Sequence, residues 1–222
     1  MATTAGTLFS AKLKEVTQAD HSEAESSEFI TTLMGGSRSS RDYVLLLAQY
    51  TYIYAALESE VRALSERHEL AALFDLRLER AAHIHADLAI LLPTHGFADI
   101  PAPLEATVDY VRHIRDAAED PARIVAHHYL RYLGDLSGGQ IIGRLVERHY
   151  GITPEALSMW RFDGIDKYKP YKDEYRRKLD AYAVTPERAS ALLEEAAKGF
   201  TLNKALFRDL LTQSQLSTLM SA

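Results

Sequence analysis

The stretch PARIVAHHYLRYLGDLSGGQIIGRLVERH, residues 121–149, decides the fold class because it keeps helical periodicity from end to end. Its apolar side chains recur at spacings of three and four residues, which places them along one face of a helix. Glycines nevertheless interrupt it at Gly134, Gly138, Gly139 and Gly143. Each glycine costs about 0.5–1 kcal/mol relative to alanine inside a helix, so the four together cost about 2–4 kcal/mol. We infer that the helix is kinked and that the local backbone geometry requires glycine at these positions.

Two explanations account for this need. Gly134 and Gly138 are four residues apart and share a face, so a flat ligand can approach the backbone there. Alternatively, the small residues permit a second helix to cross closely. Asp135 favours a ligand, because a carboxylate in an otherwise apolar segment is costly unless it is solvated or hydrogen-bonded. Periodicity alone leaves both explanations open.

Helical spacing also extends over most of the remaining chain. Between residues 39 and 64, a Ser39 N-cap precedes a stripe with steps of four and three, formed by Tyr43, Leu47, Tyr50, Tyr54, Leu57, Val61 and Leu64. Further helices are predicted at about residues 8–25, 70–92, 103–118, 171–183 and 186–213. The joints between helices carry the breakers Gly35-Gly36, Pro93 to Pro103, Gly151 to Pro154, and Gly164 to Pro170.

No stretch shows the alternation of apolar and polar residues that is typical of a β-strand, followed by a hairpin turn. The sequence therefore predicts an all-α helical bundle, with residues 1–222 forming one domain and disorder most expected at about residues 1–7 and 215–222.

Composition narrows the classes of function. The 222 residues contain no cysteine, which excludes disulfides and thiolate metal sites. The 25 Lys and Arg against 31 Asp and Glu give a net charge of −6, so no nucleic-acid partner is expected. Neither end has the pattern of a signal peptide or a membrane anchor. We expect a soluble, cytoplasmic protein.

The ten residues RYLGDLSGGQ, Arg131 to Gln140, resemble the distal-helix signature of the heme oxygenase family, in the biliverdin-forming type shared by animals and bacteria. The resemblance implies that heme b is both cofactor and substrate. It also implies that heme lies between a proximal N-terminal helix and the kinked distal helix.

The proximal side is carried by KEVT at residues 14–17 and HSEAE at residues 21–25, which resemble the family's proximal helix. The resemblance implies that His21 binds the iron. Glu25, four residues on, is placed to hold the other ring nitrogen. Without the distal signature, the favoured interpretation of His21 is an ordinary histidine of an amphipathic helix, and the signature reverses this preference. The other eight histidines read as structural, and the adjacent His127 and His128 point in different directions and cannot chelate together.

The family resemblance extends to further heme contacts. Lys14, Lys172 and Arg176 are implied as partners of the heme propionates, and a solvated basic face is the alternative for the last two. Tyr129 matches a tyrosine at the heme edge, while Phe200, with Asn203, matches the C-terminal helix that closes the proximal wall. Core packing is the alternative for these. The resemblance covers about residues 8–25, 43–60, 124–151 and 171–207, and residues 65–120 carry no assignable motif.

The implied activity converts heme, O2 and external electrons into biliverdin, by resemblance the α isomer, with carbon monoxide and ferrous iron. We hypothesise that Asp135 acts through ordered water together with Arg131 and Tyr54, and that the backbone at Gly134 and Gly138 steers bound oxygen. No flavin or nicotinamide motif is present, so an external electron-donor protein of ferredoxin or reductase type is expected at the basic residues. The alternatives are a non-catalytic heme carrier or sensor, and a helical protein that binds no heme.

Overall fold

Helix α4 (Ser40–Leu64) lies at the centre of the bundle because its apolar stripe is buried along its whole length. Tyr43, Leu47, Tyr54 and Leu57 have no exposed surface. The helix begins where the sequence predicts: the backbone N–H and the hydroxyl of Ser39 both donate to Asp42 Oδ2, at 3.0 and 2.8 Å. The predicted stripe and its N-cap residue are confirmed.

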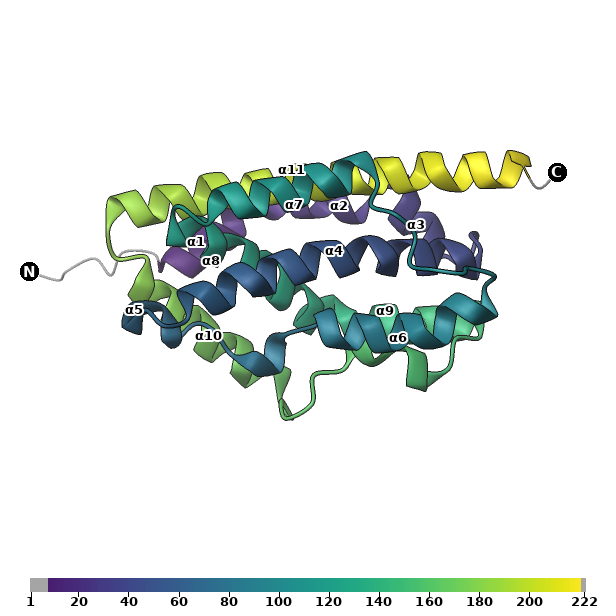
Figure 1. The fold of residues 1–222 in the computed structure, drawn as a ribbon. Helices are drawn as coiled ribbons and strands as arrows, with labels where there is room; N and C mark the ends of the chain where they lie inside the picture. The colour runs from purple at the N-terminus through teal and green to yellow at the C-terminus, as the bar shows by residue number, and fades with distance from the viewer. Residues whose placement is uncertain (1–7, 221–222) are drawn as a thin grey trace, which may run out of the picture.

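The computed structural model describes residues 8–220, and this range contains no β-strand. The all-α prediction is confirmed. Helix α11 (Pro186–Met220) runs along one side of the bundle and packs against α7 (Glu105–Ala117) and α8 (Pro121–His128) (Figure 1). Helix α4 also contacts α6 (Ala81–Thr94). No helix within residues 8–220 is both long enough and apolar enough to cross a membrane.

The N-terminal segment forms two helices instead of the single predicted one. Helix α1 (Phe9–Val16) and helix α2 (Gln18–Glu25) meet at Thr17, and α3 (Glu28–Met34) follows. The hydroxyl of Thr17 donates to the carbonyl of Leu13 at 2.8 Å, a local bond that bends helices. Lys14 and His21 therefore belong to different helices, contrary to the expectation of one helix over residues 8–25.

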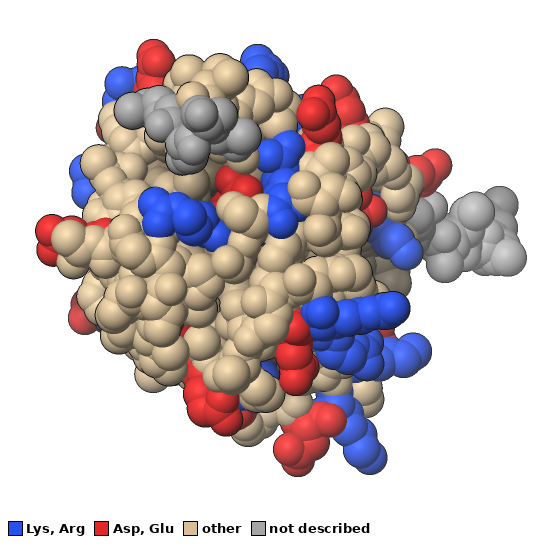
Figure 2. All heavy atoms as spheres, turned by 90° about the vertical axis from the view of Figure 1, so that its right-hand side faces the viewer, with Lys and Arg blue, Asp and Glu red and all other residues tan. Residues whose placement is uncertain are grey.

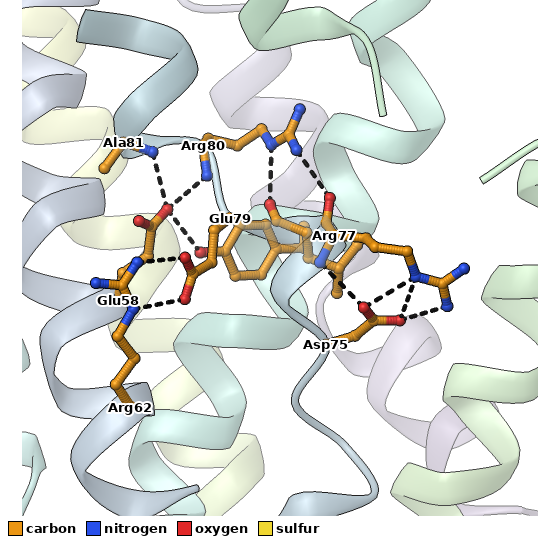
Figure 3. Close-up of polar contacts among 9 residues, drawn as sticks. Glu58, Arg62, Asp75, Arg77, Glu79, Arg80 and Ala81 are labelled. Atoms are coloured by element: carbon orange, nitrogen blue, oxygen red, sulfur yellow. Dashed lines mark hydrogen bonds and ion pairs between the residues drawn. The ribbon is translucent and has the colours of Figure 1, made fainter. Parts of the chain in front are cut away.

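The prediction of one helix over residues 70–92 is wrong in its first half. A short α5 (His68–Ala71) and a 3-10 turn, η1 (Leu76–Leu78), precede α6. Side chains define the start of α6 here: Glu58 Oε1 accepts hydrogen bonds from the backbone N–H groups of Arg80 and Ala81, at 2.5 and 2.9 Å (Figure 3). These contacts cross from α4, so local periodicity does not report them.

The segment that decides the fold is helical throughout but changes its winding. Helix α8 passes into a π-helical turn, η2 (Tyr129–Leu133), and continues as α9 (Gly134–Tyr150). The expected irregularity thus falls directly before the glycines, and π turns within α-helices occur frequently at functional sites. Two 3-10 turns, η3 (Pro154–Ala156) and η4 (Ser158–Trp160), lead away from α9.

The last two helices are longer than the sequence predicted. Helix α10 (Tyr168–Tyr182) begins inside the joint expected up to Pro170, because proline is tolerated in the first turn of a helix. Helix α11 continues through residues 215–220, where disorder was expected, and residues 1–7 and 221–222 lie outside the described range. At the end of the molecule where α11 terminates, acidic and basic side chains are interspersed between wide uncharged areas (Figure 2).

Candidate active site

A cleft of about 340 Å³ separates the N-terminal helices from the start of α9. Helices α1 and α2 form one wall, η2 and α9 form the other, and α10 and α11 contribute the remaining side chains. Residues that the sequence singled out line it: Lys14, His21, Tyr129, Gly134, Lys172, Arg176 and Phe200. Five further lining residues were not predicted as contacts: Thr17, Leu133 and Ser137, which lie within the quoted motifs, and Gln18 and Leu130, which lie beside them.

His21 stands on the proximal wall with a half-exposed side chain. Its Nδ1 lies 3.3 Å from Glu25 Oε2, one helical turn on, as the i, i+4 spacing predicts. Its ring makes an edge contact with Phe200 of α11, with 5.9 Å between ring centroids. With Nδ1 held by the carboxylate, Nε2 is the nitrogen left to coordinate a metal.

The glycines of the distal helix fall into two pairs with different surroundings. A Cβ atom added to Gly134 would meet nothing within 4 Å, and one added to Gly138 would meet only the tip of Ile142, at 4.0 Å. A Cβ atom on Gly139 or Gly143 would instead approach Trp160 to 3.0 or 3.4 Å. Close packing therefore explains the second pair, whereas open space explains the first.

Basic side chains lie where α10 meets the cleft. Lys172 Nζ donates to Ser137 Oγ at 2.9 Å, which ties α10 to the distal helix. Burial, with the nearby positive charge of Arg176, lowers the pKa of Lys172 below its usual value. Arg176 donates to Asp173 Oδ1 at 3.0 Å and also lines the cleft. Cations beside apolar walls suit a flat, apolar ligand that carries anionic groups.

Asp135 lies behind the distal wall and is bonded to Tyr54. The Tyr54 hydroxyl donates to Asp135 Oδ2 at 2.6 Å. Desolvation raises the pKa of Asp135 to about 6, against the opposing effects of Arg131, the Tyr54 hydrogen bond and Arg80. The structure therefore joins two of the three residues that the sequence expected to act together.

Arg131, the third of these residues, is buried beside that pair. Its Nη1 donates to Asn203 Oδ1 at 3.0 Å. Its guanidinium carbon lies 4.6, 5.0 and 5.6 Å from the ring centroids of Tyr50, Tyr54 and Tyr110, within the range of cation–π attraction. Arg131 Nε and Nη2 have no hydrogen-bond partner in the protein. These two donors are free to bind water or a small ligand.

Comparison with known proteins agrees with this arrangement. The family model described as heme oxygenase matches residues 7–209. The chain belongs to the heme oxygenase family. Heme oxygenase 1 of Gallus gallus is 34% identical over 202 residues, covering 89% of this chain and 68% of the relative. Heme oxygenase of Guillardia theta is 31% identical over 201 residues, covering 90% and 84%.

Solved structures show the same fold. Heme oxygenase-2 of the cyanobacterium Synechocystis, solved in complex with heme and NO, superposes with a TM-score of 0.87 at 27% identity, covering 95% of this chain and 88% of that one. The structure of heme oxygenase from Leptospira interrogans gives 0.83 at 31% identity, covering 90% and 98%. The resemblance inferred from the distal signature is confirmed. As a heme oxygenase, this chain is an oxygen-dependent, heme-degrading enzyme.

A second polar layer, which includes Arg80 from the region without a motif, supports the distal side of this heme oxygenase. Arg80 is 1% exposed, and its guanidinium donates to backbone carbonyls, including those of Leu78 and Arg77 at 2.9 and 2.8 Å (Figure 3). Glu58 Oε1 accepts from the Tyr132 hydroxyl at 3.3 Å. Arg80 is thus a fixed buried cation whose charge lowers the pKa of Asp135 against the effect of burial.

Proposed function

We propose that the cleft binds heme b, as both cofactor and substrate, and that His21 would hold the iron. One observation carries this proposal: an imidazole and the side-chain-free backbone of Gly134 line the same cleft beside three basic residues. The open space at Gly134 fits a flat ring, and Lys14, Lys172 and Arg176 fit two propionates. When bound, heme supplies the iron that activates dioxygen and the ring that is opened.

Each wall has its own role. Glu25 holds the His21 ring in the orientation and tautomer that present Nε2 to iron. Phe200 and Tyr129 close the cleft around the ring. On the distal side, the bare backbone of Gly134 and Gly138 would leave room for dioxygen in the cleft and would set which edge of the ring is opened. We expect the α isomer of biliverdin, with carbon monoxide and ferrous iron.

Proton supply is assigned to the groups behind the distal wall. Asp135 accepts from Tyr54 through Oδ2, so Oδ1 is left to hold a water molecule. The unpartnered donors of Arg131 are left to orient the next one. We assign to Asp135, Arg131 and Tyr54 a chain of ordered water that delivers protons to the cleft. Electrons come from an external protein of ferredoxin or reductase type that docks at the basic residues. We expect the protein to act in the cytoplasm.

Hemin titration followed by addition of a reductant under air tests the proposal. We expect a Soret shift that saturates at one heme per chain, followed by loss of the heme band with release of carbon monoxide and bile pigment. His21→Ala should weaken iron ligation, and added imidazole should restore it. His85→Ala, an exposed position on α6, should match the unmodified protein. A heme band that persists without carbon monoxide would indicate a carrier or sensor, and no Soret shift would exclude heme binding.

A further inference from the structure

Three helices bring a second group of potential metal ligands together outside the heme cleft. His113 of α7, His127 of α8 and Glu195 of α11 place one donor atom each within 4.8 Å of one another. None of these residues lines the cleft. Among the side chains that the structure describes, no other three His or carboxylate groups converge in this way. Their positions, 82 and 68 residues from Glu195, explain why sequence spacing did not reveal them.

The donor atoms converge on one point. His113 Nε2 lies 2.5 Å and His127 Nε2 lies 2.7 Å from the same oxygen, Glu195 Oε1. The two rings are 5.7 Å apart and inclined at 73°, so their nitrogen lone pairs approach from different directions. Two imidazoles and one carboxylate, with a further position open to water, form a donor set typical of zinc and ferrous iron.

The carboxylate is held in the orientation that such a site needs. Arg123 Nε donates to Glu195 Oε2 at 2.8 Å, which leaves Oε1 directed at the two imidazoles. Hydrogen-bonded carboxylates of this kind are the usual support of metal ligands. The His127 side chain is fully buried and that of Glu195 is 6% exposed, whereas the His113 side chain is 20% exposed. An ion can therefore enter, and keep a water ligand, on the side of His113.

We propose that His113, His127 and Glu195 bind one divalent transition-metal ion of the zinc class, which links α7, α8 and α11. Binding replaces the two imidazole–carboxylate hydrogen bonds with metal bonds. It also requires the His127 proton to sit on Nδ1, which has no hydrogen-bond partner in the protein, and it leaves the charge of Arg123 close to the ion. Both effects oppose binding, so we expect an affinity below that of a four-ligand structural zinc site.

Isothermal titration of Zn²⁺ into the heme-loaded chain of residues 1–222 tests the proposal, since heme then occupies the cleft. We expect one Zn²⁺ per chain and no binding of Mg²⁺, which prefers oxygen ligands. His113→Gln and Glu195→Gln each remove a ligand, so each should weaken Zn²⁺ binding by at least the tenfold to 100-fold, roughly, that loss of an outer-shell partner causes. His85→Ala should leave it unchanged. The Soret band of each variant reports whether the fold is kept.

X-ray absorption at the zinc edge provides a measurement that needs no variant. We expect scattering from two imidazoles and light oxygen ligands in the chain loaded with one equivalent of Zn²⁺. Absence of Zn²⁺ binding, binding in the two Gln variants as tight as in the unmodified chain, or a spectrum without imidazole scattering would overturn the proposal.

Discussion

Burial determines the acid–base behaviour of Asp135. Its carboxyl is held by the Tyr54 hydroxyl at 2.6 Å, and desolvation moves its pKa to about 6, into the range of working pH. The sequence identified Asp135 because a carboxylate among glycines is unusual in a helix. The pKa could not be predicted from the sequence, because the desolvation of the carboxylate and its distance from Arg80 are set by tertiary packing.

The raised pKa predicts a pH dependence. The Tyr54 hydroxyl donates a hydrogen bond to the ionised carboxylate of Asp135, and protonation of this carboxylate interferes with that bond. We therefore expect turnover by the heme-loaded enzyme to fall as pH decreases through about 6. Because the folded pKa lies above the unfolded value near 3.8, the contribution of Asp135 to stability has the opposite sign. It is fully present below about 3.8 and is lost as pH rises through about 6. Asp135→Asn should keep heme binding, remove both dependences and lower biliverdin yield.

Initial rates of biliverdin formation between pH 5 and 8, with chemical reductant in excess, measure this dependence. Asp166→Asn is the matched control, because that carboxylate is exposed in the loop before α10 and does not line the cleft. An inflection near pH 6 that survives in Asp135→Asn would assign the titration to another group.

At the scale of the element, the distal helix combines two functions. The sequence placed Gly134 and Gly138 on one face, open to a flat ligand, and indicated no separate role for Gly139 and Gly143. In the structure Gly139 and Gly143 face Trp160, while Gly134 and Gly138 face open space. Trp160 is fixed by its own hydrogen bond, Nε1 to the Tyr43 hydroxyl at 2.9 Å, so it has little freedom to move aside. The same helix is therefore packed on one face and left bare on another.

Alanine substitutions should distinguish the two faces. Gly134→Ala adds a Cβ that meets no neighbour, so we expect heme-free stability to be unchanged or to rise by up to about 1 kcal/mol, from helix propensity. Its heme affinity should fall, because the methyl group enters the cleft. Gly139→Ala brings a Cβ within 3.0 Å of Trp160 and should destabilise the heme-free fold by about 1–3 kcal/mol. Urea unfolding and hemin titration of both variants measure these effects, and equal behaviour would contradict the assignment.

Secondary structure was predictable where one periodic stripe decides it, as in α4, and not where single side chains decide it. Thr17 divides the first helix through a hydroxyl bond to Leu13. Glu58 defines the start of α6 from another helix, at a distance of 23 residues in sequence from Ala81. The Glu58 contact outweighs local propensity because it satisfies backbone donors that would otherwise lack partners, whereas the Thr17 hydroxyl competes for a backbone acceptor.

At the scale of the whole molecule, the sequence predicted which residues form the cleft better than how the helices are arranged around it. The distal and proximal motifs each named one wall, but neither showed that α10 is tied to the distal helix through Lys172 and Ser137. The cluster of His113, His127 and Glu195 lay beyond sequence reasoning altogether, since its members come from three helices. The adjacent His127 and His128 were predicted not to chelate one ion together, and His127 instead lies beside His113 and Glu195.

This arrangement predicts where heme binding should stabilise the molecule. Helices α1 and α2 have eight residues each, shorter than the ~12–15 residues at which isolated helices become marginally stable. Within α2 only Ala24 is fully buried, so this wall should open locally before α4 does. If opening of α2 releases heme, a free heme concentration of 100 times the Kd should slow its amide exchange about 100-fold.

Hydrogen exchange measured with and without heme tests this localisation. Amides of α2 should gain protection, whereas those of α6 that exchange by local opening should not, because α6 contributes no residue to the cleft. His21→Ala serves as the control, since loss of the iron ligand should remove most of the gain. Equal protection of α2 and α6 would place the stabilisation in the bundle as a whole. Protection confined to α2 would mean that heme itself completes the proximal wall.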